Sequence, residues 1–206
     1  MCIIVVKEKG LAVPSENILA TCFENNGDGA GLMYTENGAV KIEKGFMDLD
    51  SLLNKLAKLE ERFGSLKEKA LVLHFRIKSY GNVNPGNTHP YPLSANPEDY
   101  KQLKFSCELA VAHNGTLSAY KPQGADEAAD LNDTQVFIRD YLYQLFLTKA
   151  GFLEDETVKA AILQQLDEGK LAFLDKNDRL VTIGDFEEAA GIKYSNVSYL
   201  EKKTDN

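Results

Sequence analysis

Position 2 holds a cysteine, Cys2, at the head of the apolar run 3–6. If Met1 is removed, Cys2 carries a thiol and a free α-amine on the same carbon. The α-amine titrates near ~8 and the thiol near ~8.5, so each exchanges protons close to neutral pH, and a nucleophile is then joined to its own base. The alternative is a small buried residue that opens a strand, because free cysteines are mostly buried and inert. Cys2 is therefore a candidate nucleophile that other segments of the sequence must support.

A second candidate group follows the apolar segment 109–112, in the tripeptide His113-Asn114-Gly115. Asn-Gly is the strongest short signal for a tight turn, so a plain hairpin is one interpretation. In the functional interpretation, the Asn114 side chain and the Gly115 backbone N–H each offer a hydrogen-bond donor. Two such donors form an oxyanion hole for the tetrahedral intermediate of acyl transfer.

Arg76 and Asp133 carry complementary charges that suit a free amino acid. Arg76 lies near the end of a buried-type strand. Because burial of a lone guanidinium is costly, either an internal carboxylate or a carboxylate ligand must pair with it. Asp133 precedes an amphipathic stretch, where a helix N-cap is the simpler explanation, but a carboxylate there could also bind an ammonium group. Arg76 and Asp133 would then hold the carboxylate and the ammonium of one amino acid, and bidentate pairing by arginine would orient it.

Short stretches rich in Val, Ile, Leu or Phe predict the strands that position these residues: 2–6, 30–34, 40–44, 70–77, 107–112, 171–174 and 180–183. Apolar residues at helical spacing predict helices over 15–23, 49–63, 133–149 and 154–166. Segments 25–31, 81–96 and 120–132 are predicted loops, and the long one after Arg76 is expected to be functional. Helices that cluster between runs of strands favour an α+β layered domain over a parallel doubly wound sheet.

The chain has 206 residues, 44% hydrophobic and 26% charged, which suits one domain over residues 1–206. The net charge is -8, and no cluster of Lys and Arg is interleaved with aromatic residues, so no nucleic-acid surface is expected. No apolar run is long enough to span a bilayer, and the N-terminus lacks a signal-peptide pattern. The cysteines are widely spaced, and the histidines have no zinc-ligand spacing. We expect a reduced, cytoplasmic protein with no metal and no membrane contact.

Several motifs occur in a fixed order along the chain: Cys2, His74-Phe75-Arg76 with Gly81, Asn87-Thr88-His89-Pro90, His113-Asn114-Gly115, and Asn132-Asp133-Thr134. This ordered set resembles the class II glutamine amidotransferase domain of the N-terminal-nucleophile hydrolases. The segment 27–31 resembles the early Asp-Gly-x-Gly turn of that family. The tail 191–196 resembles the ending of small stand-alone members, including phage-encoded ones.

The resemblance implies a four-layer αββα sandwich that hydrolyses the side-chain amide of glutamine without a cofactor. Cys2 would attack the amide carbon, and its own amine would shuttle the proton. Asn114 and Gly115 would stabilise the oxyanion. Ammonia would leave, and water would then release glutamate from the thioester.

The resemblance also implies how glutamine is held. By motif position, Arg76 would bind the substrate carboxylate and Asp133 its amino group. Ser79 and Gly81 would lie in the substrate loop.

The sequence has no phosphate-binding Gly-rich loop and no nucleotide fingerprint that would indicate a synthase. Released ammonia would therefore pass to a separate synthetase or transferase partner. One alternative is a hydrolase of the same fold that acts on γ-glutamyl or other small amides. Another is a non-catalytic regulatory or binding protein that retains the fold.

Overall fold

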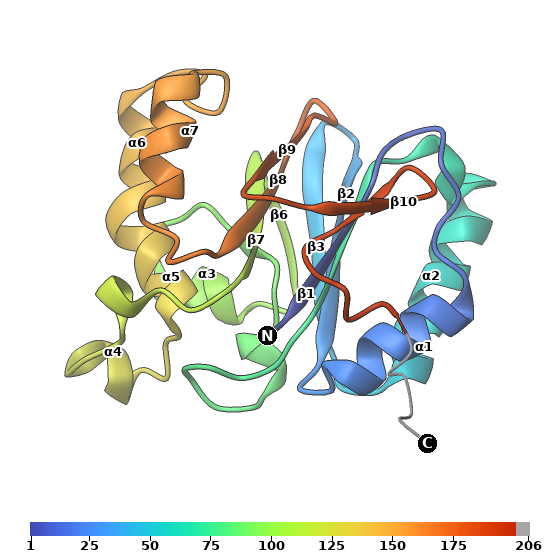
Figure 1. Cartoon of the computed structure of the whole chain (residues 1–206), viewed down its shortest axis with the longest axis horizontal. Helices are drawn as coiled ribbons and strands as arrows, with labels where there is room; N and C mark the ends of the chain where they lie inside the picture. Colours follow the sequence, from blue (N-terminus) through green and yellow to red (C-terminus); the bar gives the residue numbers. More distant parts are fainter. Residues whose placement is uncertain (201–206) are drawn as a thin grey trace.

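The strands of this protein pair into two antiparallel sheets, seen in the computed structural model, which describes residues 1–200 (Figure 1). The seven-stranded sheet has the order β10-β11-β1-β4-β2-β3-β6 and the four-stranded sheet the order β5-β7-β8-β9. The first sheet contains β1 (Ile3–Lys7), β2 (Ala30–Glu36), β3 (Ala39–Phe46), β4 (Leu71–Phe75), β6 (Lys104–Cys107), β10 (Glu187–Ala189) and β11 (Ile192–Tyr194). The second contains β5 (Tyr91–Pro92), β7 (Leu109–Asn114), β8 (Lys170–Asp175) and β9 (Leu180–Ile183).

Strand β1 shows how the layers form, because every one of its residues is buried. Ile3 and Val5 pack into a cluster on the outer face of the larger sheet, while Ile4 and Val6 pack into the cluster between the two sheets. Successive side chains of a strand point to opposite faces, so a strand that is apolar throughout must be covered on both sides.

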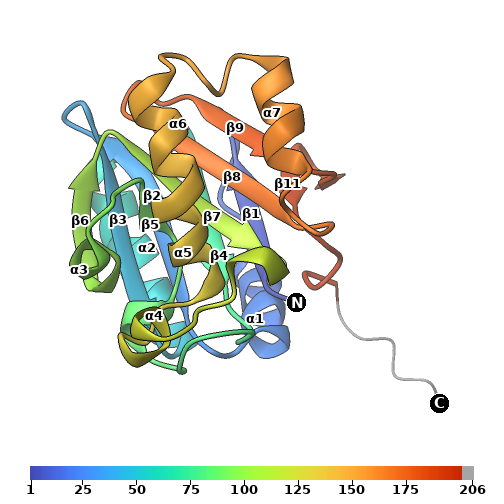
Figure 2. The same cartoon turned by 90° about the vertical axis from the view of Figure 1, so that its left-hand side faces the viewer.

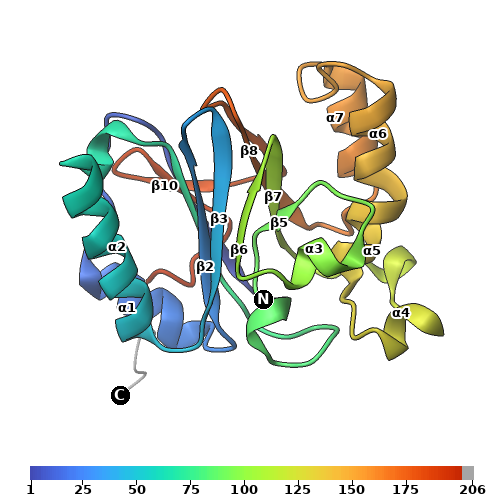
Figure 3. The same cartoon turned by 180° about the vertical axis from the view of Figure 1, so that it is seen from behind.

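Helices cover the outer face of each sheet. Helices α1 (Glu16–Asn25) and α2 (Leu49–Phe63) pack on the larger sheet, as seen from behind in Figure 3. Helices α5 (Asp133–Phe137), α6 (Tyr143–Thr148) and α7 (Glu156–Leu163) pack on the smaller sheet (Figure 2). Two short helices, α3 (Pro97–Lys101) and α4 (Ala125–Ala128), lie in the connections. The α+β class expected from the sequence is confirmed, and no helix within residues 1–200 has the length and apolar character needed to cross a membrane.

The predicted strands all contain strand residues, but 107–112 is not one strand. β6 ends at Cys107 and β7 begins at Leu109, so the chain passes from the larger sheet to the smaller one at Glu108. The short strands β5, β10 and β11 were not predicted. The predicted long loop is also wrong in part, because it contains β5 and a 3-10 turn at Pro85–Asn87.

The predicted helices are present, with two local differences. Ser15 caps α1 and Asp48 caps α2, each by accepting a backbone N–H. The predicted helix 133–149 contains a π-helical turn at Ile138–Leu142 between α5 and α6. The predicted helix 154–166 is shorter, since α7 spans Glu156–Leu163 after its cap Asp155, and the predicted loop 120–132 contains α4.

Lys7 is fully buried at the end of β1. Its Nζ donates hydrogen bonds to the carbonyl oxygens of Leu11 and Leu66, each at 2.7 Å. Burial lowers the pKa of Lys7. The ammonium therefore links the first strand to the segment that precedes β4.

Replacing Lys7 by methionine is expected to lower the free energy of unfolding by about 2–4 kcal/mol, because a buried and a partly buried carbonyl lose their donor. Urea denaturation measures the change. The matched control is Lys9→Met, which alters an exposed lysine two residues along. Equal stability of the two variants would contradict the role of the buried ammonium.

Candidate active site

Cys2 directly precedes β1, and its thiol is buried against the backbone of Ile77. The Sγ–H donates to the Ile77 carbonyl at 3.2 Å, and the Ile77 N–H donates to Sγ at 3.3 Å. Burial raises the pKa of the thiol, while the Ile77 N–H and the charge of Arg76 oppose that rise. Met1 is 82% exposed, so its removal would leave the packing around Cys2 in place.

One small cavity of about 10 Å³ brings together residues from distant parts of the chain. Among the predicted site residues, it is lined by Cys2, Arg76, Ser79, Gly115 and Asp133. Gly115 also lines an adjoining open cleft of about 740 Å³, together with Asn114. Gly81 lines neither of these two. It lies with Ser79 in a neighbouring surface cavity of about 400 Å³.

Arg76 follows β4 and is 3% exposed. Its guanidinium donates to the backbone carbonyls of Tyr80 at 2.9 Å and Asn82 at 3.0 Å. Within residues 1–200, no ion pair includes Arg76. Of the two partners considered for Arg76, an internal carboxylate is therefore absent from this part of the chain, and loop carbonyls bind the guanidinium because the chain turns back over it.

Asp133 is the first residue of α5, not its cap. The cap is Asn132, which forms a reciprocal capping box with Gln135, and the Asn-x-x-Gln spacing is a sequence signal that would have identified it. The buried Asp133 carboxylate accepts from the backbone N–H of Leu117 at 2.7 Å and of Thr134 at 2.9 Å. Burial raises the pKa of Asp133, and these backbone bonds oppose the rise.

Asn114 ends β7, and Gly115 continues the chain with a φ of 147°. A Cβ atom at position 115 would lie 2.8 Å from the Gly169 Cα and 2.9 Å from the His113 Nε2. Only glycine therefore fits at this position. The Asn114 side chain is buried and hydrogen-bonded to the Ser195 hydroxyl at 2.8 Å.

Three buried histidines lie at the small cavity: His89 and His113 line it, and His74 stacks on His89. The rings of His74 and His89 stack with 4.2 Å between centroids. The backbone N–H of His113 donates a hydrogen bond to His89 Nδ1 at 3.2 Å. Burial lowers the pKa of His74 and His113 to about 3. Because the bonding partner of the Cys2 thiol is the Ile77 backbone, these neutral rings form a structural group beside the thiol.

Acid is expected to destabilise the fold through this group. His74 and His113 bind protons near pH 6.5 when unfolded and near pH 3 when folded, so the unfolded state holds more protons in between. The free energy of unfolding should fall with decreasing pH over that window, by about 1.4 kcal/mol per pH unit for each ring. Urea denaturation at several pH values measures the slope, which should be shallower in His74→Gln. Identical slopes in both proteins would contradict the assignment.

Asp130 fixes the loop that covers Arg76. Its Oδ1 accepts from the backbone and side-chain nitrogens of Asn82 at 2.8 and 2.9 Å, and its Oδ2 accepts from the side chains of Asn84 at 2.8 Å and Asn87 at 3.0 Å. Since the Asn82 carbonyl in turn binds Arg76, Asp130 supports the guanidinium indirectly. Sequence reasoning missed Asp130, because an aspartate in a polar loop carries no distinguishing pattern.

If the cavity binds glutamine, Asp130→Ala is expected to raise KM about 10-fold with little change in kcat, since charge-assisted hydrogen bonds that order the loop are lost. Steady-state kinetics separate the two constants. Glu127→Ala, which removes an exposed carboxylate from the same segment, is the control and should leave KM unchanged. A fall in kcat alone would contradict a role in holding the loop.

The fold of this chain is similar to that of a solved glutamine amidotransferase. The structural similarity is to glutamine phosphoribosylpyrophosphate (PRPP) amidotransferase from B. subtilis, solved in complex with ADP and GMP, with a TM-score of 0.57 and 13% sequence identity. The match covers 97% of this chain and 42% of that chain, so this chain spans less than half the length of that protein. No family model and no curated protein matches the sequence.

Proposed function

We propose that this protein hydrolyses the side-chain amide of glutamine, with Cys2 as the nucleophile after Met1 is removed. The observation that carries the proposal is the cavity in which Cys2, Arg76, Gly115 and Asp133 meet. The fold similarity supports glutamine amide chemistry at a general level. We also propose that residues 1–206 form a single domain, built as a four-layer αββα sandwich.

The reaction begins when the Cys2 α-amine takes the thiol proton and Sγ attacks the amide carbon of glutamine. The negative charge on the carbonyl oxygen is stabilised by the Asn114 amide and the Gly115 N–H. The α-ammonium returns its proton to the departing nitrogen, which leaves as ammonia. Water then attacks the thioester, releases glutamate and restores the thiol.

Arg76 and Asp133 would bind the two charged groups of glutamine. A cavity of about 10 Å³ holds roughly one water molecule, so the loop that carries Ser79 and Gly81 must open to admit the substrate. The substrate ammonium would hold Asp133 in its charged form and so offset the effect of burial on its pKa.

The large cleft beside Gly115 offers a route for ammonia toward a separate synthetase or transferase partner. Its volume of about 740 Å³ exceeds what ammonia requires, so the same cleft favours a second candidate function. In that case the substrate is a γ-glutamyl amide, and the group on the amide nitrogen occupies the cleft. A comparison of kcat/KM for glutamine and for a γ-glutamyl alkylamide distinguishes the two.

The first experiment is the intact mass of the purified protein before and after treatment with a glutamine-like diazoketone. Loss of Met1, one adduct on Cys2 and production of glutamate from glutamine are the expected results. Loss of Met1 without an adduct points to a different amide, and retained Met1 without an adduct favours the non-catalytic alternative. The half-buried Cys107 is the internal control for unspecific alkylation.

A further inference from the structure

Ser195 lies one residue after β11, is fully buried, and connects the strand of the nucleophile to the end of β7. Its backbone N–H donates to the Ile4 carbonyl at 2.9 Å. Its Oγ accepts from the Ile4 N–H at 2.8 Å and lies 2.8 Å from the Asn114 amide nitrogen. The Ser195 hydroxyl is therefore placed between β1 and the candidate oxyanion donor.

With the Asn114 amide nitrogen facing Ser195, the hydrogen-bond donors and acceptors of the two side chains are not all paired. A hydroxyl has one hydrogen and two lone pairs, and here both lone pairs accept, from Ile4 and from Asn114. No hydrogen bond of the described residues uses the Ser195 hydroxyl as the donor. The Asn114 Oδ1 is also buried without a partner in this part of the chain. Buried polar groups are rarely left unpaired, and here a donor and an acceptor both are.

Rotation of the Asn114 amide by 180° pairs the Ser195 hydroxyl hydrogen with the Asn114 oxygen and leaves the amide nitrogen as the group without a partner. The nitrogen and oxygen of an asparagine amide have nearly the same shape, so their assignment follows from the hydrogen-bond network. After rotation, Oδ1 faces Ser195 and accepts its hydroxyl hydrogen, while Oγ still accepts from Ile4. The remaining free group is then the Asn114 NH2, a donor that suits a negatively charged oxygen.

We propose that Ser195 is a positioning residue that donates its hydroxyl hydrogen to Asn114 Oδ1 and thereby presents the Asn114 NH2 to the oxyanion. This inference rests on the proposed glutamine hydrolysis. Without the hydroxyl, the amide has no partner that selects its orientation, and in the opposite one it would direct an oxygen toward the developing negative charge.

The residue next to Ser195 also binds the proposed nucleophile, Cys2. Asn196 donates its side-chain amide to the Cys2 carbonyl at 2.6 Å, and Lys170 Nζ donates to the Ser195 carbonyl at 2.6 Å. The dipeptide Ser195-Asn196 therefore contacts both the residue that attacks and the residue that stabilises the charge. Displacement of this dipeptide would alter the two groups together.

The kinetic test compares Ser195→Ala with Ser195→Thr. Ser195→Ala should lower kcat roughly 10- to 100-fold, somewhat less than deletion of an oxyanion donor, with KM for glutamine within about twofold. Ser195→Thr retains the hydroxyl and should recover most of the lost kcat. Thr35→Val is the matched control, because it removes a buried hydroxyl that bonds to Asp178 away from the site. A kcat for Ser195→Ala close to that of the unmodified protein would overturn the proposal.

Neutron diffraction from crystals of the unmodified protein supplies a readout that needs no activity. A hydrogen on Ser195 Oγ directed at Asn114 supports the proposal, and amide hydrogens of Asn114 directed at Ser195 overturn it, whether or not the variants fold. If glutamine is hydrolysed and the amide hydrogens face Ser195, the Ser195 proposal fails alone. If the unmodified protein does not hydrolyse glutamine, the proposed function fails, and the oxyanion role of the pair fails with it.

Discussion

Cys2→Ala should reduce glutamine hydrolysis by at least about 10⁴-fold, the effect typical of removing a nucleophile from an enzyme that works through a covalent intermediate. Cys2 lies at the start of a buried strand, and alanine is a smaller residue that suits the same environment. The variant should therefore remain folded. Release of glutamate and ammonia measures the reaction, and thermal denaturation confirms the fold.

The control for this prediction is Cys22→Ala. Cys22 is also a buried cysteine, but it packs among apolar residues of α1 and the larger sheet. Its removal should cost stability and leave turnover per folded molecule unchanged. Residual turnover in Cys2→Ala equal to that of Cys22→Ala would exclude Cys2 as the nucleophile.

Arg76→Lys should lower kcat/KM for glutamine by about 30- to 4,000-fold, because truncation of one member of a buried, hydrogen-bonded charge pair costs about 2–5 kcal/mol. Lysine keeps the positive charge but cannot bond Tyr80, Asn82 and a carboxylate in the planar geometry of a guanidinium. Most of the loss should appear in KM. Steady-state kinetics with glutamine measure it.

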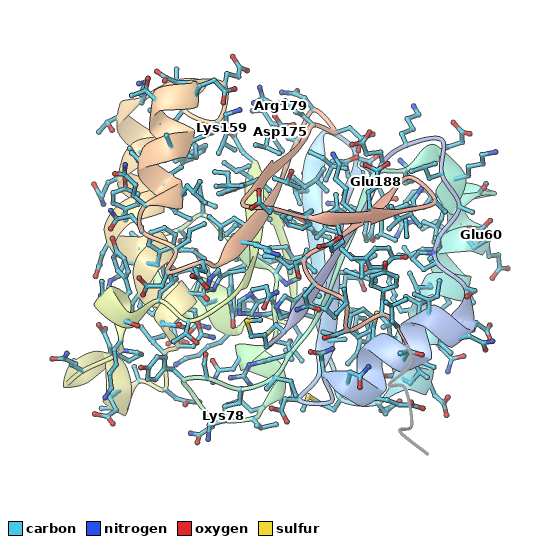
Figure 4. The ribbon with its side chains drawn as sticks, viewed as in Figure 1. Glu60, Lys78, Lys159, Asp175, Arg179 and Glu188 are labelled. Atoms are coloured by element: carbon cyan, nitrogen blue, oxygen red, sulfur yellow. The ribbon has the colours of Figure 1, made fainter. Side chains whose placement is uncertain are left out.

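Lys78→Ala is the control for a general loss of positive charge near the loop. Figure 4 shows Lys78 at the edge of the molecule, at the end opposite to Asp175 and Arg179. Its side chain is exposed, so its removal should change kcat/KM little. Equal losses in the two variants would indicate electrostatic attraction of the substrate and not direct binding by Arg76.

The sequence predicts the central strands and α2 well, because their apolar residues recur with the period of the structure. The strands and the strand break that were not predicted lack such a pattern. β10 and β11 are three residues each and contain Glu187, Glu188 and Lys193, so they lack a strand-like apolar pattern. β11 pairs with β1, which lies almost the whole chain away in sequence, and β10 then pairs with β11. The break at Glu108 is hidden because apolar residues continue on both sides of it.

The candidate site, too, could be predicted from the sequence only in part. The residue types of Cys2, Arg76 and Asp133 indicate their chemistry, and the structure brings all three to one cavity. Their supporting contacts could not be predicted, because they come from the path of the backbone. The carbonyls that bind Arg76 and the hydroxyl of Ser195 belong to residues whose types have no special signature in sequence.

The pairing of β1 determines when, during translation, the surroundings of Cys2 can form. β1 lies between β4 and β11, and β11 is followed at once by Ser195 and Asn196, which contact Ile4 and Cys2. A nascent chain that has not reached these residues already contains the thiol but has one open edge beside it. The contacts that hold Cys2 in place are therefore completed late in translation, and a chain that stops before β11 would carry the thiol without them.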